Sequence, residues 1–482
     1  MKQKISLVSR FLPKNRFVRG VSVLVVGTVV AQGVMVLASP FLTRLYSPED
    51  FGLLAVFTAL LSTVVVVASL RYELAIPLPD SDEDALPLLV LSLSIVIAMA
   101  ALSAIPLLLF RHEIAKLCNT PALASYIWLV PLGALFAGGY NVLNYWGVRT
   151  KAFTPLAKTK VSQSLAAVGI QLGGASLGPA ALLVGQVAGN ASGSLSLGLR
   201  LLPRWREAVA RLSPAAIVQS ARRYKAFPMF SASCAVLDTV ASQLPAVLFA
   251  MLFSAAAAGS YGLAYRVLSV PMQLLGQAIG NVFLSSGAQA HRDGKLRPMV
   301  LRIHRQLAHL GMPPILVLLI AGPEVFTQVF GPNWEQAGVF AQWLAPWLYL
   351  VFITTPLSAL FEVLERQGIA MVIQGVTLVV RVAAISIGAW LGDLVVAVAL
   401  FALGNCACKL ATLSCVIHLS GNKWRCLWHP SASALAWSVP LVSPVLLGTI
   451  WRIDQQLWIL AFASASLFIA VRYTWLMKRT WA

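Results

Sequence analysis

Apolar runs of about 20 residues, long enough to cross a membrane as helices, recur along most of this 482-residue chain. Hydrophobic residues make up 59% of the sequence and charged residues 11%, and the mean hydropathy is +0.80. A water-soluble domain could not bury so much apolar surface, so lipid must be the solvent for much of the chain. We therefore predict an all-α polytopic membrane protein of about 14 transmembrane helices.

The predicted spans follow one another closely, and the external loops between them are short. The fifth run is the shortest, and its border with the sixth is not marked. Gly185, Gly189 and Gly193 in the sixth span form a pattern of small residues that predicts close helix packing. The spans are expected near residues 20–46, 52–76, 86–110, 122–147, 160–175, 180–199, 227–252, 259–285, 306–330, 338–363, 369–391, 394–419, 432–450 and 457–476.

Basic residues are distributed unevenly among the predicted loops. With the N-terminus inside, 27 of the 36 Lys and Arg residues fall in cytoplasmic segments, and only Arg111, Lys116 and Arg452 fall in external loops. Cytoplasmic loops of membrane proteins collect Lys and Arg, so we predict a multi-pass protein of a bacterial inner membrane with both termini cytoplasmic. The net charge of +19 then reflects the anionic inner leaflet, and we expect no nucleic-acid partner.

The reactive residue types indicate neither a metal site nor an enzyme. Only Cys118 falls in an external loop, while Cys406 and Cys408 point to opposite sides of one helix. The longest external loop, 111–121, leaves no room for catalytic groups, and a phosphate-binding loop of the GxxxxGK[ST] type is missing. We expect no metal, no cofactor and no catalytic residue.

A weak internal repeat relates two tight external turns. Shifting LTRLYSPEDFGLLAVF (42–57) by 207 residues onto LFAMLFSAAAAGSYGLA (248–264) places Ser47 on Ser254 and Gly52 on Gly259. The repeat predicts two six-helix lobes in parallel orientation, which is typical of transporters with a site between the lobes. The predicted domains are an N-terminal lobe (1–199), a basic cytoplasmic linker (200–226), a C-terminal lobe (227–419) and two additional transmembrane helices (420–482).

Several predicted spans carry polar residues along one helix face. A charge at mid-membrane costs roughly 2.5–3.5 kcal/mol, so it usually marks a cavity or a pathway. The helical spacing aligns Arg381 with Gln374 and Thr377, and it aligns Lys409 with Asn405. The alternative is that such groups only hydrogen-bond one helix to another. The candidate substrate-cavity residues are Arg266, Arg381, Lys409, Gln273, Gln277, Gln374, Gln32 and Arg71.

Asp238 and Glu73 are two acidic residues that fall within the predicted spans. Asp238, near the centre of the seventh span, is either an ion-coupling site or the counter-ion of a cavity arginine, and we favour the counter-ion. Glu73 lies beside Arg71 near the cytoplasmic end of the second span, where snorkelling to the membrane surface explains both charges.

Five segments, taken in order, resemble one family over most of residues 15–420. Together they are similar to the oligosaccharide flippases of polysaccharide biosynthesis, the O-antigen (Wzx-type) translocases. That family belongs to the multidrug/oligosaccharidyl-lipid/polysaccharide exporter superfamily, with the multidrug and toxin extruders and the lipid II flippase. The two extra C-terminal spans resemble the lipid II flippase. The segments are TRLYSPEDFGLLAVF (43–57), NYWGVRTKAF (144–153), ARRYKAFPMFS (221–231), GLAYRVLSVPMQLLGQAIGNVF (262–283) and VFGPNWEQAG (329–338).

The resemblance implies a flippase that moves polyprenyl-pyrophosphate-linked oligosaccharide from the cytoplasmic to the periplasmic leaflet by alternating access. It also implies a polysaccharide polymerase and chain-length proteins as partners. A pyrophosphate with several sugars needs a polar, cationic cavity in place of its hydration, and Arg266, Arg381 and Lys409 suit that anion. A cation-coupled multidrug antiporter of the same superfamily is the alternative, although the first span carries no acid. A membrane sugar polymerase or ligase is disfavoured by the short external loops.

Overall fold

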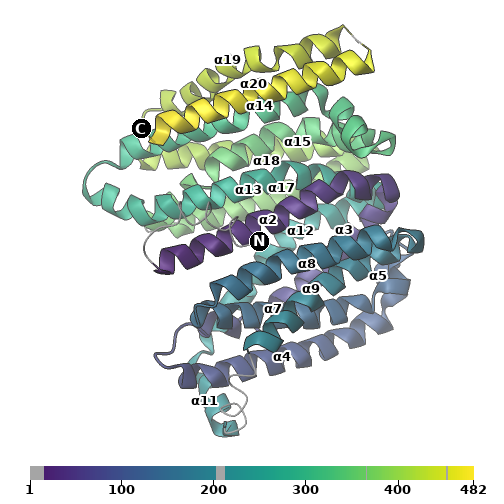
Figure 1. The fold of residues 1–482 in the computed structure, drawn as a ribbon, viewed down its shortest axis with the longest axis vertical. Helices are drawn as coiled ribbons and strands as arrows, with labels where there is room; N and C mark the ends of the chain where they lie inside the picture. Colours follow the sequence, from purple (N-terminus) through teal and green to yellow (C-terminus); the bar gives the residue numbers. More distant parts are fainter. Residues whose placement is uncertain (1–15, 202–211, 365, 452–453, 482) are drawn as a thin grey trace, which may run out of the picture. The chain divides into compact units, whose positions relative to one another are not determined.

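The computed structural model describes residues 16–201, 212–364, 366–451 and 454–481, and every regular element within these ranges is a helix (Figure 1). Helices satisfy their own backbone hydrogen bonds, which a membrane-spanning segment requires. The predicted all-α class is therefore confirmed. By its internal contacts the chain divides into two compact units, Met1–Gly259 and Ser260–Ala482.

The first unit holds the first seven long helices and the beginning of an eighth. Helix α2 packs along α8, α9 packs on α7 and α8, α4 packs on α7, and α12 packs along α3. The elements are α2 (Arg16–Leu45), α3 (Pro48–Val67), η1 (Tyr72–Ala75), α4 (Asp82–Leu109), α5 (Arg111–Leu117), α6 (Leu123–Tyr126), α7 (Leu129–Arg149), α8 (Phe153–Gly173), η2 (Ala175–Leu177), α9 (Pro179–Leu201), α11 (Pro214–Arg223), η4 (Phe227–Ser231) and α12 (Ala232–Leu252).

The second unit contains most of α13 and the helices that follow it. Helix α14 packs on α15 and α19, α18 packs on α15 and α17, and α20 lies beside α19 (Figure 1). Helix α14 is kinked at Ala321, two residues before Pro323, because proline cannot donate the helical hydrogen bond. The elements are α13 (Ala255–Arg292), α14 (Leu296–Phe330), η5 (Pro332–Trp334), α15 (Glu335–Thr354), η6 (Leu357–Ala359), α16 (Leu360–Val363), α17 (Gln367–Trp390), α18 (Leu394–Leu419), α19 (Arg425–Ile450) and α20 (Gln455–Trp481).

Ten helices in the described ranges are long and apolar enough to cross a membrane, and each overlaps a predicted span. The bounds differ at some ends: α3 ends at Val67 rather than at residue 76, and α14 begins at Leu296 rather than at residue 306. The other four predicted spans fall on α7, α8, α9 and α13, which are long helices that do not meet the same criterion. The multi-pass membrane fold is thus confirmed, while the exact count of 14 stays a prediction. The predicted lobe boundaries also stay a prediction, because the division into units falls inside α13 and groups α12 with its packing partner α3.

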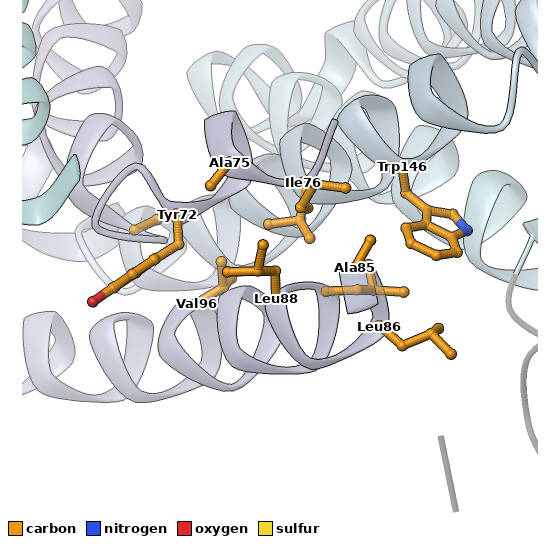
Figure 2. Packing of buried hydrophobic residues seen from close by; sticks show 11 residues of the cluster. Tyr72, Ala75, Ile76, Ala85, Leu86, Leu88, Val96 and Trp146 are labelled. Atoms are coloured by element: carbon orange, nitrogen blue, oxygen red, sulfur yellow. The ribbon is translucent and has the colours of Figure 1, made fainter. Parts of the chain in front are cut away.

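A hydrophobic cluster holds one end of the first unit together (Figure 2). It joins the segment after α3 to the start of α4 and the last turns of α7, where Trp146 is fully buried. The hydroxyl of Tyr72 donates a hydrogen bond to the carbonyl oxygen of Ala221 at 3.0 Å. Helix α11, which lies in the predicted linker, is therefore tied to this cluster.

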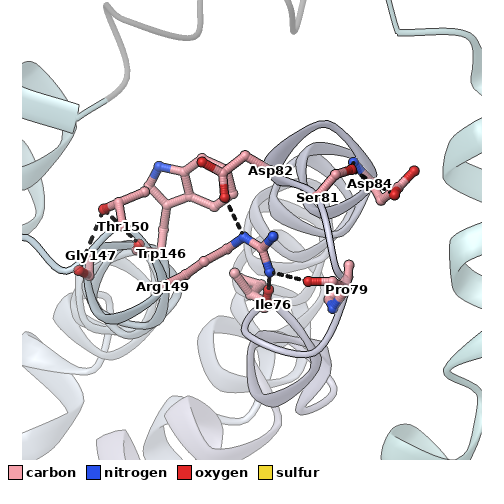
Figure 3. Close-up of polar contacts among 9 residues, drawn as sticks. All are labelled: Ile76, Pro79, Ser81, Asp82, Asp84, Trp146, Gly147, Arg149 and Thr150. Carbon is pink, nitrogen blue, oxygen red and sulfur yellow. Dashed lines mark hydrogen bonds and ion pairs between the residues drawn. The ribbon is translucent and has the colours of Figure 1, made fainter.

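Arg149, at the last turn of α7, fixes the loop between η1 and α4 (Figure 3). Its Nη1 donates to the carbonyl oxygens of Ile76 and Pro79 at 3.1 and 2.8 Å, and its Nε donates to Asp82 Oδ1 at 2.9 Å. The loops 77–85 and 148–153 therefore lie at the same end of the unit. The predicted topology requires this, since it assigns both loops to one side of the membrane.

Candidate functional site

The best-organised polar group among the predicted cavity residues surrounds Arg381 in the second unit. Arg381 on α17 donates from Nε to Asn405 Oδ1 on α18 at 2.8 Å. The Asn405 side chain is fully buried, and its Nδ2 donates to the carbonyl oxygen of Phe401 at 2.7 Å. The amide is thus bonded at both ends, which fixes its oxygen toward the guanidinium.

Four aromatic rings complete this arrangement. The Arg381 guanidinium carbon lies 5.8 Å from the Trp347 ring centroid, a cation–π contact. Tyr265 stacks between Trp347 and Tyr261, with a centroid separation of 5.9 Å on each side. Phe401 meets Trp347 and Tyr261 edge-on at 5.3 and 5.8 Å. We name Tyr261, Tyr265, Trp347, Arg381, Phe401 and Asn405 the Arg381 cluster.

Burial separates the supporting members of the Arg381 cluster from those that a ligand could reach. Tyr261, Trp347, Phe401 and Asn405 are buried, whereas Tyr265 and Arg381 are partly exposed. Buried rings fix the orientation of the two accessible side chains, as binding sites require. The cluster therefore offers a cation and a phenol on a rigid apolar support, which suits an anionic ligand that also carries apolar faces and hydroxyl groups.

The remaining predicted cavity residues of the second unit are placed as follows. Lys409 lies one turn after Asn405 on α18 and is partly buried. Gln374 lies two turns before Arg381 on α17 and is exposed. Arg266 directly follows Tyr265 on α13 and is partly buried. Gln273 and Gln277 also lie on α13, but their side chains are outside the described part of the structure.

The first unit holds the other predicted residues. Gln32 on α2 and Asp238 on α12 are both exposed. Arg71 lies between α3 and η1 with a left-handed backbone (φ 64°), and its Nη1 is 3.5 Å from Glu73 Oε1. Glu73 is only 3% exposed and accepts a hydrogen bond from the Ser69 hydroxyl. The structure therefore places Glu73 in a buried polar group, whereas a snorkelling side chain would be exposed.

Sequence reasoning identified the polar half of the Arg381 cluster and missed the aromatic half. Arg381 and Asn405 stood out because charged and amide groups are rare in apolar runs. Trp347 and Phe401 are apolar residues within apolar runs, so no sequence pattern distinguished them from lipid-facing or core residues. The spacing of Tyr261 and Tyr265, four residues apart on one helix face, was a usable signal.

The chain is similar in sequence to proteins of polysaccharide biosynthesis. Residues 41–338 match a family model described as polysaccharide biosynthesis protein. The chain is 26% identical over 373 residues to the succinoglycan biosynthesis transport protein ExoT of Rhizobium meliloti (strain 1021), covering 75% of this chain and 72% of that protein.

Two solved structures show a similar fold at low sequence identity. A lipid II flippase MurJ in an inward closed conformation has a TM-score of 0.69 at 10% identity, covering 95% of this chain and 99% of that chain. An inward-facing multidrug resistance MATE family transporter has a TM-score of 0.65 at 14% identity, covering 84% and 99% of the two chains. The fold is therefore shared by proteins that move quite different substrates.

Proposed function

This chain belongs to the polysaccharide biosynthesis protein family, and on that premise we propose that it flips polyprenyl-pyrophosphate-linked oligosaccharide from the cytoplasmic to the periplasmic leaflet. Like its relatives, it is a multi-pass membrane transporter and not an enzyme. The Arg381 cluster carries the proposal, because it holds a cation beside aromatic rings among apolar helices. A pyrophosphate that crosses the membrane needs such a cation in place of water.

Arg381 and the partly exposed Tyr265 suggest a division of roles. Arginine is matched in geometry to phosphate oxygens, since its planar guanidinium carries several N–H donors. An aromatic ring presents a flat apolar face and, in tyrosine, a hydroxyl that pairs with other polar groups. In this proposal Arg381 binds the pyrophosphate, Tyr265 contacts the first sugar, and Lys409 adds positive charge nearby. Alternating access would then expose this site to each side in turn.

Reconstituted vesicles test the proposal. Vesicles that contain the purified chain and a polyprenyl-pyrophosphate oligosaccharide should move the sugar to the outer leaflet, where a membrane-impermeant glycosidase removes it. Vesicles with Arg381→Ala should retain the sugar inside. The alternative, a cation-coupled multidrug antiporter, predicts instead that a proton or sodium gradient drives cationic dyes across while the oligosaccharide stays in place. Dye transport without sugar movement would overturn the proposal in favour of that alternative.

The proposed direction of transport requires the predicted topology, with both termini cytoplasmic in a bacterial inner membrane. A cytoplasmic reporter fused at residue 215, in α11, or at the C-terminus should be active. Activity of alkaline phosphatase, which folds only in the periplasm, at either position would contradict the topology.

A further inference from the structure

The two turns related by the internal repeat lie against each other at one end of the first unit. Helix α3 begins at Pro48 and α13 begins at Ala255, which is 207 residues later. A Cβ added to Gly52 would lie 1.8 Å from the carbonyl oxygen of Ala255. A Cβ added to Gly259 would lie 2.0 Å from the carbonyl oxygen of Pro48. Both helices therefore approach so closely that only glycine fits at either position.

These two contacts are equivalent under the repeat. The shift of 207 residues that carries Gly52 onto Gly259 also carries Pro48 onto Ala255. Each glycine thus contacts the first residue of the other helix, as in a two-fold symmetric interface where residue i meets j and j meets i.

The helix caps show the same correspondence. Ser47 Oγ accepts a hydrogen bond from the Asp50 amide at 3.2 Å, and Ser254 Oγ accepts one from the Ala257 amide at 3.1 Å. The same shift relates both serines and both amides. These caps fix where α3 and α13 begin, and so they fix the glycines at the point of closest approach.

The obstacles that a larger residue would meet are backbone atoms. The Gly52 position faces the carbonyl oxygen, carbonyl carbon and Cα of Ala255, and the Gly259 position faces the carbonyl of Pro48 and the amide nitrogen of Gly52. A flexible side chain could move aside, but two capped helix ends can make room only by separating. Close glycine contacts of this kind let helices associate in membranes through packing alone.

We infer that Pro48, Gly52, Ala255 and Gly259 form a gate, here called the glycine clasp, that closes one end of the transporter. The clasp lies at the end that the predicted topology assigns to the periplasm. It is closed in the conformation described, and α3 and α13 separate when the site opens outward. This inference rests on the proposed transport function, but the state of the clasp can be measured without any substrate.

Distances between spin labels test the clasp directly. The labels are attached to Glu49→Cys and Ala256→Cys, which flank the contact, in a chain whose native cysteines are replaced. The unsubstituted clasp should give mostly short distances. Gly52→Ala and Gly259→Ala should each shift the population mostly to long distances, to a similar degree. The double variant should add little further, because a contact opened from one side is already lost.

Matched controls separate an opened gate from a disturbed helix. Gly33→Ala and Gly169→Ala place the same methyl group in α2 and α8, where a Cβ would meet nothing within 4 Å. Both controls should keep the short distances. Short distances that persist in Gly52→Ala and Gly259→Ala, or an equal shift in the controls, would overturn the inference.

Covalent closure provides a measurement that does not depend on weakening the fold. A cleavable bismaleimide that joins Glu49→Cys to Ala256→Cys should stop transport, and cleavage should restore it. Transport that continues with the link intact would show that the clasp does not gate. If the oligosaccharide is the wrong substrate, the spin-label shifts remain and only the transport assay fails, so the two proposals can be told apart.

Discussion

Arg381 is a charged residue among apolar helices, and side chains of two neighbouring helices stabilise it. Its guanidinium contacts the Asn405 amide on the neighbouring helix and the Trp347 ring on a third. These contacts offset part of the cost of placing a charge among apolar helices. These neighbours therefore hold the guanidinium in a fixed position, as binding of an anionic substrate requires.

Substitutions at Arg381 should separate the contribution of the guanidinium's charge to transport from that of its planar shape. Arg381→Ala should abolish export of surface polysaccharide at normal protein levels. Loss of the two charge-assisted hydrogen bonds of a bidentate pair costs about 3–6 kcal/mol, which weakens binding more than about a hundredfold. Arg381→Lys should restore part of the export, since the charge remains but the planar fork is lost. Trp347→Phe, which keeps an aromatic face, should have the smallest effect. Full export by the alanine variant would exclude Arg381 from the site.

Cys118 gives a second test at the scale of one residue. Burial raises the pKa of its thiol, so at neutral pH less thiolate is present, and the thiolate is the form that reacts with maleimides. In a chain that retains only Cys118, a membrane-impermeant maleimide on intact cells should label it slowly, and faster as the pH rises. In the matched background, Leu117→Cys, at a position 64% exposed, should label rapidly. Equal labelling rates would show that the Cys118 region opens.

At the scale of elements, apolar runs predicted where the long helices lie, because length and hydropathy mark a membrane span, but they did not predict every helix end. They were less decisive for α8 and α9, whose polar residues are used between helices. Gln171 on α8 donates from Nε2 to the carbonyl oxygen of Leu182 on α9 at 3.1 Å. A Cβ on Gly185 would lie 2.6 Å from the Gln171 side chain, so the predicted close packing of that glycine is confirmed. Such pairings lower hydropathy without moving a helix out of the membrane.

The loop held by Arg149 could not have been predicted, because its partners lie 67–73 residues earlier in the chain. Arg149→Ala should lower the thermal unfolding temperature in detergent. It removes two charged hydrogen bonds to carbonyl groups from a side chain only 7% exposed, at a cost of roughly 3–6 kcal/mol. Asp82→Asn is the control: Asp82 is 46% exposed, and exposed ion pairs contribute little. Equal losses for both variants would contradict this assignment.

At the scale of the whole molecule, the sequence predicted a repeated architecture but could not show how the repeats meet. Gly52 and Gly259 were aligned by the 207-residue shift, yet their reciprocal contacts depend on the tertiary fold. Similarly, the predicted stripes showed which helix faces are polar but not which helices face one another. Arg381 finds its hydrogen-bond partner on the neighbouring α18, so it has less need of a distant counter-ion than its sequence position suggested.

The role of Asp238 on α12, as a counter-ion or as an ion-binding residue, can be tested by combining substitutions. If it is a counter-ion, Asp238→Asn should lower protein abundance, and adding Arg266→Gln or Lys409→Gln should recover abundance but not transport. Arg381→Gln should rescue least, since Arg381 already contacts Asn405 and Trp347. If Asp238 instead binds a coupling cation, no second substitution helps, and transport in Asp238→Asn vesicles stops responding to an imposed pH or sodium gradient. Abundance and gradient-driven transport, measured in a double-mutant cycle, separate these outcomes. Additive losses with all three cations would exclude the counter-ion role.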